Sequence, residues 1–382
     1  VFFRRLLMGF AVLLIILTRI TGIPDREDSA DFYTLVLGAT LGMSLMASAN
    51  HLLMIFLAVE MASVPSYVLA GILKGRRKSS EAALKYAVYG AGAAGVMLYG
   101  ISLLAGLSGT CHLPTLAARL AQMDIPNIIA TGEGGETLRA LVLGGLMVGV
   151  GLAFKLSAFP FHFWCPDVFE GAAAEVNAFL SVASKAAALG LLLRVSFGLA
   201  VLPGGAASET VAVAPTPPPG EVAVVDESDA KLVSYQEPTE LGQANQSASD
   251  IPQLSSAPLA PVRRFLVMLI AIVAAVTCTF GNLAAYGQAN IKRMLAYSTI
   301  AHAGYMMMPV AAALAVAGAN PALARDAVAA LAFYIVLYLF MNLGAFAIVA
   351  FFRNAMWSEE IKDYAGLVKS CPVAVVCFSL IL

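Results

Sequence analysis

The sequence predicts an all-α protein that crosses a membrane many times. Hydrophobic residues make up 60% of the chain and charged residues only 12%, and the mean hydropathy is +0.82. Soluble proteins carry about 25% charged residues. Long apolar runs recur along the chain without the alternation of a membrane β-barrel. Because only helices and closed barrels satisfy their backbone in lipid, these runs indicate transmembrane helices.

About ten apolar runs divide the chain. The first run is shorter than the roughly 20 residues that span a bilayer, and it lacks a signal-peptide cleavage site. The last run stops at Leu382 without a polar flank. We therefore expect the protein to continue beyond both ends, and we predict a peripheral helix and loop at 1–31. The runs lie at about residues 6–17, 32–49, 51–73, 82–107, 138–165, 172–202, 265–287, 291–318, 327–352 and 365–382.

Two polar segments set the orientation and divide the chain. The loop KGRRK at 74–78 is the densest basic cluster beside the runs, which predicts a cytoplasmic position by the positive-inside rule. Counting runs places the loop at 108–137 and the segment 203–261 on the opposite side. This second segment is rich in Pro, Ser and acidic residues, and it cannot bury enough apolar surface to offset its ordering entropy. We predict a mostly disordered outer loop there, either without a function of its own or docking a partner.

Two charged residues of the first half are candidates for proton handling. Glu60 stands mid-run with no basic residue within one turn, and Pro65 shortly after it frees a backbone carbonyl. An intramembrane carboxyl indicates proton handling or lysine pairing, with a structural hydrogen bond to a neighbouring helix as the alternative. Lys85 follows Glu81 by four residues. It therefore pairs locally, snorkels to the cytoplasmic face or belongs to a relay.

The stretch 154–194 places Lys155 and Lys185 in two otherwise apolar runs. A lysine desolvated in this way comes within reach of reversible protonation near neutral pH, which a proton relay needs. Pro160 between them predicts an interrupted helix, the usual site of ion passage in transporters. His162 either relays protons or hydrogen-bonds a freed carbonyl. The aromatic residues of FHFW indicate packing rather than a cofactor site.

The second half offers Lys292, which opens a run, and His302 ten residues deeper. Lys292 either snorkels to the surface or carries protons. The net charge of -1 offers no basic surface for nucleic acid, and the five cysteines have no zinc spacing. The glycine clusters GAGAAG and GGLMVGVG indicate close helix packing. We predict no metal, haem or iron–sulfur centre in this chain, and transport is the function class that remains.

Three segments resemble the subunit N family of bacterial respiratory complex I, the NADH-quinone oxidoreductase. They are FKLSAFPFHFWCPDVFEG, NAFLSVASKAA and GNLAAYGQANIKRMLAYSTIAHAGYMMM. The resemblance covers nearly the whole chain except the acidic segment. It implies antiporter-like inverted five-helix repeats with broken transmembrane helices, the first at 32–202 and an incomplete second at 262–382.

The resemblance also implies roles for single residues. Glu60, in VEMASVPSYVL, is similar to the family's intramembrane glutamate, and Lys85, in EAALKY, to the lysine that pairs with it. Lys155 resembles the lysine of the broken helix, and Lys185 the lysine of the following helix. In the second repeat, the resemblance adds Lys292, in NIKRMLAYS, and His302, in IAHAGY, to the hydrophilic axis.

These resemblances imply a proton-translocating subunit of the cell inner membrane. NADH, FMN, iron–sulfur clusters and quinone are expected in other subunits. The expected partners are neighbouring antiporter-like and small membrane subunits and lipid, with no nucleic acid. Electron transfer elsewhere would alter a Glu60–Lys85 pair and push a proton along Lys155 and Lys185. A subunit of a multi-subunit cation/proton antiporter and a non-pumping structural subunit are the alternatives.

Two features depart from the family. Where its members usually read GAPTPVTAFLS, residues 171–181 read GAAAEVNAFLS, which adds Glu175 and Asn177 and removes two prolines. The departure leaves open the shape of the connection between the two lysine helices. The family's second broken helix, with its own lysine, is expected beyond Leu382.

Overall fold

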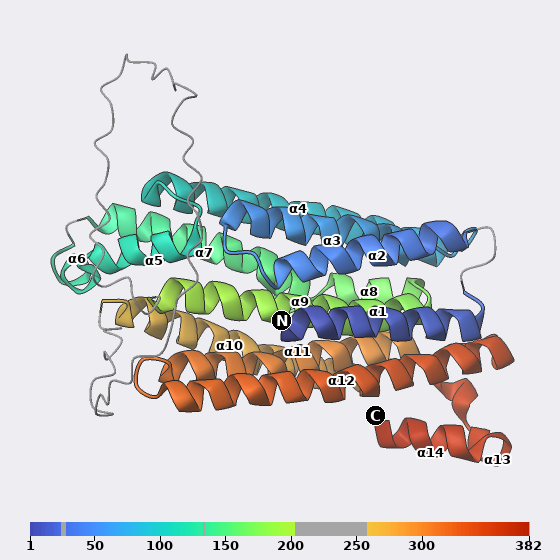
Figure 1. Ribbon diagram of the computed structural model, residues 1–382. Helices are drawn as coiled ribbons and strands as arrows, with labels where there is room; N and C mark the ends of the chain where they lie inside the picture. The colour runs from blue at the N-terminus through green and yellow to red at the C-terminus, as the bar shows by residue number, and fades with distance from the viewer. Residues whose placement is uncertain (24–27, 133, 203–257, 382) are drawn as a thin grey trace, which may run out of the picture. The chain divides into compact units, whose positions relative to one another are not determined.

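A computed structural model of the chain describes residues 1–23, 28–132, 134–202 and 258–381. The predicted loop at 203–261 lies almost wholly outside these residues. The described part is helical (Figure 1). Its longer helices are α1 (Phe2–Thr21), α2 (Ser29–Met46), α3 (Leu52–Ala70), α4 (Arg77–Ser108), α7 (Gly135–Leu156), α9 (Ala174–Ala200), α10 (Ala260–Ala285), α11 (Ile291–Val316) and α12 (Pro321–Met356). The shorter elements are α5 (Leu113–Gln122), α6 (Ile125–Thr131), α8 (Trp164–Gly171), a 3-10 turn (Ile361–Tyr364), α13 (Leu367–Ser370) and α14 (Pro372–Ile381).

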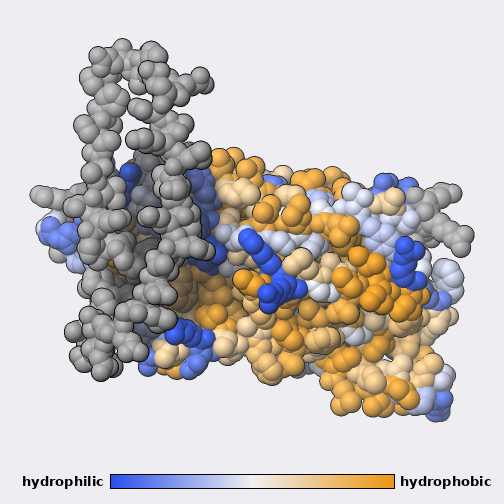
Figure 2. Space-filling model, viewed as in Figure 1, coloured by the Kyte–Doolittle hydropathy of each residue, from blue (hydrophilic) through white to orange (hydrophobic). Residues whose placement is uncertain are grey.

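Seven described helices are long and apolar enough to cross a membrane, namely α3, α4, α7, α9, α10, α11 and α12. Hydrophobic residues dominate the visible face of the helical unit, and hydrophilic ones gather mainly toward its ends, apart from one hydrophilic patch in the middle of the face (Figure 2). A water-soluble protein would bury most of these side chains, whereas a lipid-facing surface is apolar. The expected all-α, multi-pass membrane fold is confirmed.

Helix α9 forms the centre of the helical unit. Its apolar window is completely buried, and it packs against α1, α2, α3, α5, α7, α10, α11 and α12. A helix that is hydrophobic on all sides belongs in such a position. Glu175 and Lys185 are buried on α9 and therefore enclosed by protein, whereas Arg194, near the end of the helix, is partly exposed.

The predicted helix interruption lies between α7 and α8. Helix α7 ends at Leu156, and Ser157 turns the chain with a left-handed φ of 56°. The break leaves backbone groups that need partners. The Thr277 hydroxyl accepts a hydrogen bond from the Phe159 amide at 3.0 Å, and the Trp164 indole donates to the Phe154 carbonyl at 3.1 Å. Side chains thus stabilise an open segment between two helices.

Two isolated β-bridges occupy matching positions in the helix order. His51 precedes α3 and pairs with His112, which follows α4. Asn290 precedes α11 and pairs with Glu360, which follows α12. Each bridge therefore ties the start of one helix to the segment after the next helix. Beside the second bridge, the backbone carbonyl of Glu359 accepts from the Ile291 amide, which holds Glu359 next to the start of α11.

Some glycines of the predicted packing clusters lie where helices touch. A Cβ atom added to Gly100 on α4 would lie 2.6 Å from the Gly144 carbonyl oxygen on α7. A Cβ atom on Gly151 would lie 2.5 Å from the Met97 sulfur. Gly95, on the same α4 helix, has nothing within 4 Å of such an atom. The close backbone approach between α4 and α7 thus involves Gly144 of the GGLMVGVG cluster and Gly100, which lies outside the GAGAAG cluster.

Replacing Gly100 with Ala is expected to destabilise the α4–α7 contact. The added methyl group meets backbone that must shift, at a cost of about 1–3 kcal/mol. Gly95→Ala is the matched control on the same helix. Alanine has a higher helix propensity than glycine, so this variant is expected to stabilise the protein by about 0.5–1 kcal/mol. Thermal unfolding in detergent measures both variants. Equal shifts of the two midpoints would contradict the packing role of Gly100.

Candidate functional site

Glu60 and Lys155 lie on two different helices, α3 and α7, close enough for their charges to interact. Glu60 lies on α3 and is half-buried, while Lys155 lies in the last turn of α7 and is only 4% exposed. Each is the charged neighbour that acts on the other. A compensating charge nearby stabilises a buried ammonium. Glu60 supplies that charge at the end of α7, directly before the helix break.

Lys185 lies on the far side of the same break. It is 2% exposed, and its ammonium donates to the Leu156 carbonyl and to the Ser157 hydroxyl, each at 3.1 Å. The last carbonyls of a helix lack intrahelical partners and carry the negative end of the helix dipole. They therefore hold a cation without a carboxylate. Lys155 and Lys185 thus approach the break from two helices.

An aromatic wall encloses one side of the break. Tyr86 stacks on Trp164 with ring centroids 4.3 Å apart, and Phe154 lies 5.2 Å from the same indole ring. Tyr67 meets Tyr86 edge-to-face at 4.7 Å. Large apolar side chains exclude water and strengthen the electrostatic interactions near them. Of the FHFW residues, Trp164 packs as predicted, whereas Phe163 is 46% exposed.

Lys85 lies elsewhere than the resemblance implies. Its ammonium pairs with Glu81, four residues earlier on α4, and with Asp167 on α8, both at 2.8 Å. The expected Glu60–Lys85 pair is not the contact that the structure gives Lys85, because the carboxylates of Glu81 and Asp167 occupy its ammonium. The local pairing with Glu81, which the spacing allows, is confirmed.

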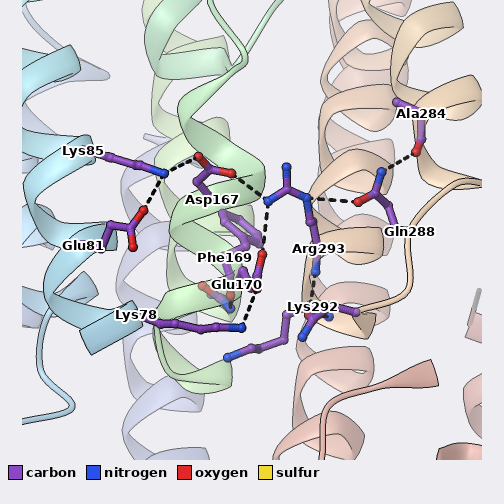
Figure 3. Close-up of polar contacts among 12 residues, drawn as sticks. Lys78, Glu81, Lys85, Asp167, Phe169, Glu170, Ala284, Gln288, Lys292 and Arg293 are labelled. Carbon is purple, nitrogen blue, oxygen red and sulfur yellow. Dashed lines mark hydrogen bonds and ion pairs between the residues drawn. The ribbon is translucent and has the colours of Figure 1, made fainter. Parts of the chain in front are cut away.

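Asp167 belongs to a charged network that joins α4, α8 and α11 (Figure 3). Arg293 on α11 donates to Asp167 at 2.7 Å and to Glu170 at 3.1 Å, and Lys78 on α4 donates to Glu170 at 2.8 Å. These side chains line a cavity of about 250 Å³. The Lys78 ammonium beside Glu170 holds the pKa of that carboxyl below its usual range. The network connects helices from both sides of the segment 203–257.

Replacing Asp167 with Asn is expected to destabilise the protein by about 1 kcal/mol, because it unpairs both Lys85 and Arg293 in a site about one-third exposed. The matched control is Glu81→Gln, which removes one surface pair on a single helix at about 0.3–0.5 kcal/mol. Unfolding midpoints in detergent compare the two variants. A larger loss of stability in Glu81→Gln than in Asp167→Asn would contradict the role of Asp167 in joining α4, α8 and α11.

Lys292 is enclosed at the start of α11. It is 3% exposed, and its ammonium contacts the Glu359 carboxylate at 2.8 Å and the Ala172 carbonyl at 2.9 Å. Glu359 is held by its backbone, since its carbonyl accepts from the Ile291 amide at 3.0 Å. Snorkelling to the surface is wrong for Lys292, because its ammonium is buried against the connection between α8 and α9 and against the segment after α12.

The two histidines differ in their surroundings. Nδ1 of His302 lies 2.7 Å from the Tyr334 hydroxyl, which joins α11 to α12. His162 lies at the helix break between Phe159 and Phe280, with ring centroids at 5.5 and 4.5 Å. Among the described contacts, none joins either histidine to Lys155 or Lys185. Their participation in a relay stays a prediction.

The departure at 171–181 provides polar contacts between elements. The Asn177 side chain donates to the Phe169 carbonyl at 2.7 Å, which ties α9 to α8. Glu175 is fully buried and pairs with Arg353 of α12 at 3.4 Å. Sequence reasoning missed the partners Asp167, Glu359 and Arg353. Acids at the 167 and 170 positions share one face of a short helix, a spacing that could have indicated the α8 network.

Comparisons with known proteins agree with this fold. The sequence model of the family described as "NADH:quinone oxidoreductase/Mrp antiporter, TM" matches residues 49–212 and 254–382. A protein of Anaeromyxobacter sp. named NADH-quinone oxidoreductase subunit N is 35% identical over the whole chain. A protein of Sorangium cellulosum named NADH-quinone oxidoreductase subunit N 2 is 37% identical over 99% of it. The chain spans 62% and 61% of these two relatives.

Solved structures give the same result. A chain of respiratory complex I from Thermus thermophilus matches 97% of this chain, with a TM-score of 0.56 and 28% identity, and the match covers 63% of that chain. A chain of the Mrp complex from Dietzia sp. covers the whole chain with a TM-score of 0.66 and 17% identity, which is a likeness of fold, and the match covers 56% of that chain. The resemblance to subunit N is confirmed. The chain belongs to the NADH:quinone oxidoreductase/Mrp antiporter transmembrane family.

Proposed function

We propose that this chain is part of the proton-translocating subunit N of an NADH-quinone oxidoreductase. The observation that carries the proposal is the convergence of Lys155 and Lys185 on one helix break. Lys155 has Glu60 as its charged neighbour, and Lys185 binds the freed end of α7. Relatives at 35% and 37% identity bear the subunit N name.

The transfer step uses the different surroundings of the two lysines. Neutralising Glu60 would remove the counter-charge of Lys155, and a buried ammonium without a counter-charge releases its proton more readily. The released proton would cross the break to a deprotonated Lys185 amine. The Leu156 carbonyl and the Ser157 hydroxyl then stabilise the new ammonium. Glu60 and Lys155 thus replace the Glu60–Lys85 pair as the controlling charges.

The redox chemistry belongs to other subunits in this proposal. NADH, FMN, iron–sulfur clusters and quinone would bind there, and this chain would receive a conformational or electrostatic signal. Its partners would be neighbouring antiporter-like and small membrane subunits of the cell inner membrane. The similar chains of known structure belong to multi-subunit membrane complexes, which supports membrane-subunit partners in general.

The helix order supports the proposal of inverted repeats. The bridge at His51 lies at the start of α3, and the bridge at Asn290 lies at the start of α11. The predicted orientation places the loop before α4 and the start of α11 on the cytoplasmic side. The start of α3 then lies on the outer side. Corresponding bridges on opposite sides are what an inverted repeat produces.

Replacing Lys185 with Met in the assembled complex is expected to lower the number of protons moved per electron. Met keeps the length of the side chain and removes the charge. Proton uptake into vesicles during NADH oxidation measures this ratio. Lys369→Met, at an exposed lysine of α13, is the control. An unchanged ratio for Lys185→Met would contradict the proposal, and sodium-dependent transport without NADH oxidation would instead support the antiporter alternative.

A further inference from the structure

An apolar cavity of about 280 Å³ lies among α4, α5, α6, α7, α9 and α10. Of the described residues that line it, Ser196 alone carries a polar side chain. Ile129, Val142 and Phe265 also line the cavity and are exposed, so it opens to the surface of the helical unit. In a membrane protein, an apolar opening of this kind faces lipid.

The cavity is elongated. Along α7, its wall runs from Leu138 to Leu152, which is about 21 Å of helix at about 1.5 Å per residue. Along α10, its wall runs from Pro261 to Ile270, which is about 14 Å. Both helices begin at the same end of the helical unit (Figure 1). One leaflet of the hydrocarbon core of a bilayer is about 15 Å deep, so the length of the cavity matches that of an extended acyl chain in one leaflet.

Two glycines of α7 keep the cavity open. Gly145 and Gly149 line it one turn apart, and neither has an atom within 4 Å of an added Cβ. Gly144 and Gly151 of the same cluster meet α4 closely instead. The glycine cluster of α7 thus packs against α4 on one face and leaves room for a ligand on another.

Arg263 brings an unsatisfied positive group to the start of α10. Its Nη1 nitrogen is buried and has no hydrogen-bond partner among the described residues. Val262, directly before it, lines the cavity, and so does Leu266. A buried donor without a partner costs stability, and a guanidinium binds phosphate through charge-assisted hydrogen bonds. This end of the cavity therefore favours a phosphate group.

We propose that the cavity binds a phospholipid, with one acyl chain along α7 and its phosphate group on Arg263. A phospholipid combines an apolar chain and a phosphate in one molecule, and the membrane that this chain crosses supplies it. The acyl chain provides the contacts that the walls of a void lack, because lipid tails are as apolar as leucine. The inference goes beyond the proposed function, since neither Lys155 nor Lys185 lines this cavity.

The test is photolabelling of the assembled complex in vesicles of phosphatidylcholine. A small share of this lipid carries a diazirine at the end of one acyl chain. Irradiation is expected to attach the probe to residues 138–152 and 261–270, which mass spectrometry of the cleaved chain identifies.

Gly149→Leu fills the cavity and is expected to lower this labelling about tenfold, because the leucine side chain displaces several methylene groups of the lipid. Gly95→Leu is the matched control. Gly95 also has nothing within 4 Å of an added Cβ, but it lies on α4 outside the cavity, so its labelling is expected to equal that of the wild type.

Arg263→Gln tests the phosphate contact, and Arg264→Gln is the control at the exposed neighbouring position. Arg263→Gln is expected to lower the labelling about tenfold, because it removes a hydrogen bond between two charged groups. A diacylglycerol with the same diazirine chain lacks the phosphate. Its labelling is expected to be equal in the wild type and in Arg263→Gln.

Lower labelling in Gly149→Leu and Arg263→Gln, with both controls unchanged, would establish the inference. Equal labelling in Gly149→Leu and Gly95→Leu, or an unlabelled cavity wall in the wild-type complex, would overturn it. An equal loss of phospholipid and diacylglycerol labelling in Arg263→Gln would also overturn it, because Arg263 would then not bind the phosphate. Should Gly149→Leu not assemble, Gly145→Leu replaces it, and the comparison of Arg263→Gln with Arg264→Gln decides independently.

Discussion

Replacing Lys155 with Ala is expected to slow proton translocation by about a hundredfold, because a positioned proton-transfer group typically contributes about 10²–10⁴ in rate. Lys155 is the lysine directly before the helix break, and it is 4% exposed. The measurement is the initial rate of proton uptake by vesicles that contain the assembled complex and oxidise NADH.

Lys155→Arg separates the charge of this residue from its proton transfer. Arginine retains the positive charge beside Glu60, so assembly is expected to be normal. It does not release its proton, so translocation is expected to fall nearly as far as in Lys155→Ala. Translocation at the wild-type rate in Lys155→Arg would show that Lys155 supplies only a fixed charge, and the relay would then have to bypass it.

Replacing Glu359 with Ala is expected to destabilise the protein by about 3 kcal/mol. The ammonium of Lys292 would remain buried without its carboxylate, and breaking a buried pair costs about 3–5 kcal/mol. The lower end of this energy range applies because the Glu359 side chain is 20% exposed, so water partly screens the pair. Thermal and denaturant unfolding of the purified complex in detergent, together with the yield of assembly, measure the loss.

The double variant Lys292→Met/Glu359→Ala is the matched control for this effect. It removes both charges, and apolar replacement of a buried pair is often close to neutral for stability. We therefore expect it to recover most of the stability while proton translocation stays low. Equal destabilisation in the single and double variants would mean that Glu359 contributes packing or backbone contacts rather than charge.

Much of the fold could be predicted from the sequence, because apolar runs and a mid-run proline report helix positions directly. The run at 138–165 contains Pro160, and the structure divides it into α7 and α8 at that point. The segment expected as a loop at 108–137 contains α5 and α6 instead. Helix α5 buries only Leu113, Leu116 and Ala117, so its short apolar face does not stand out by hydropathy.

The candidate site could be predicted only in part. A charge inside an apolar run is visible in one sequence, so Glu60, Lys155 and Lys185 could be selected. Their partners could not, because pairing depends on which helices touch. Lys85 meets Asp167 across 82 positions, and Arg353 meets Glu175 across 178. Helical spacing relates residues on one helix only, so these contacts require the packing of α4, α8, α9 and α12.

In the proposed transfer step, Glu60 controls Lys155 rather than Lys85. Two double-mutant cycles on proton translocation per electron test it most directly, one with Glu60→Gln and Lys155→Met and the other with Glu60→Gln and Lys85→Met. Residues that interact give non-additive effects, and separated residues give additive ones. We predict strong coupling in the first cycle and additivity in the second. Additivity between Glu60 and Lys155, with coupling between Glu60 and Lys85, would contradict the account.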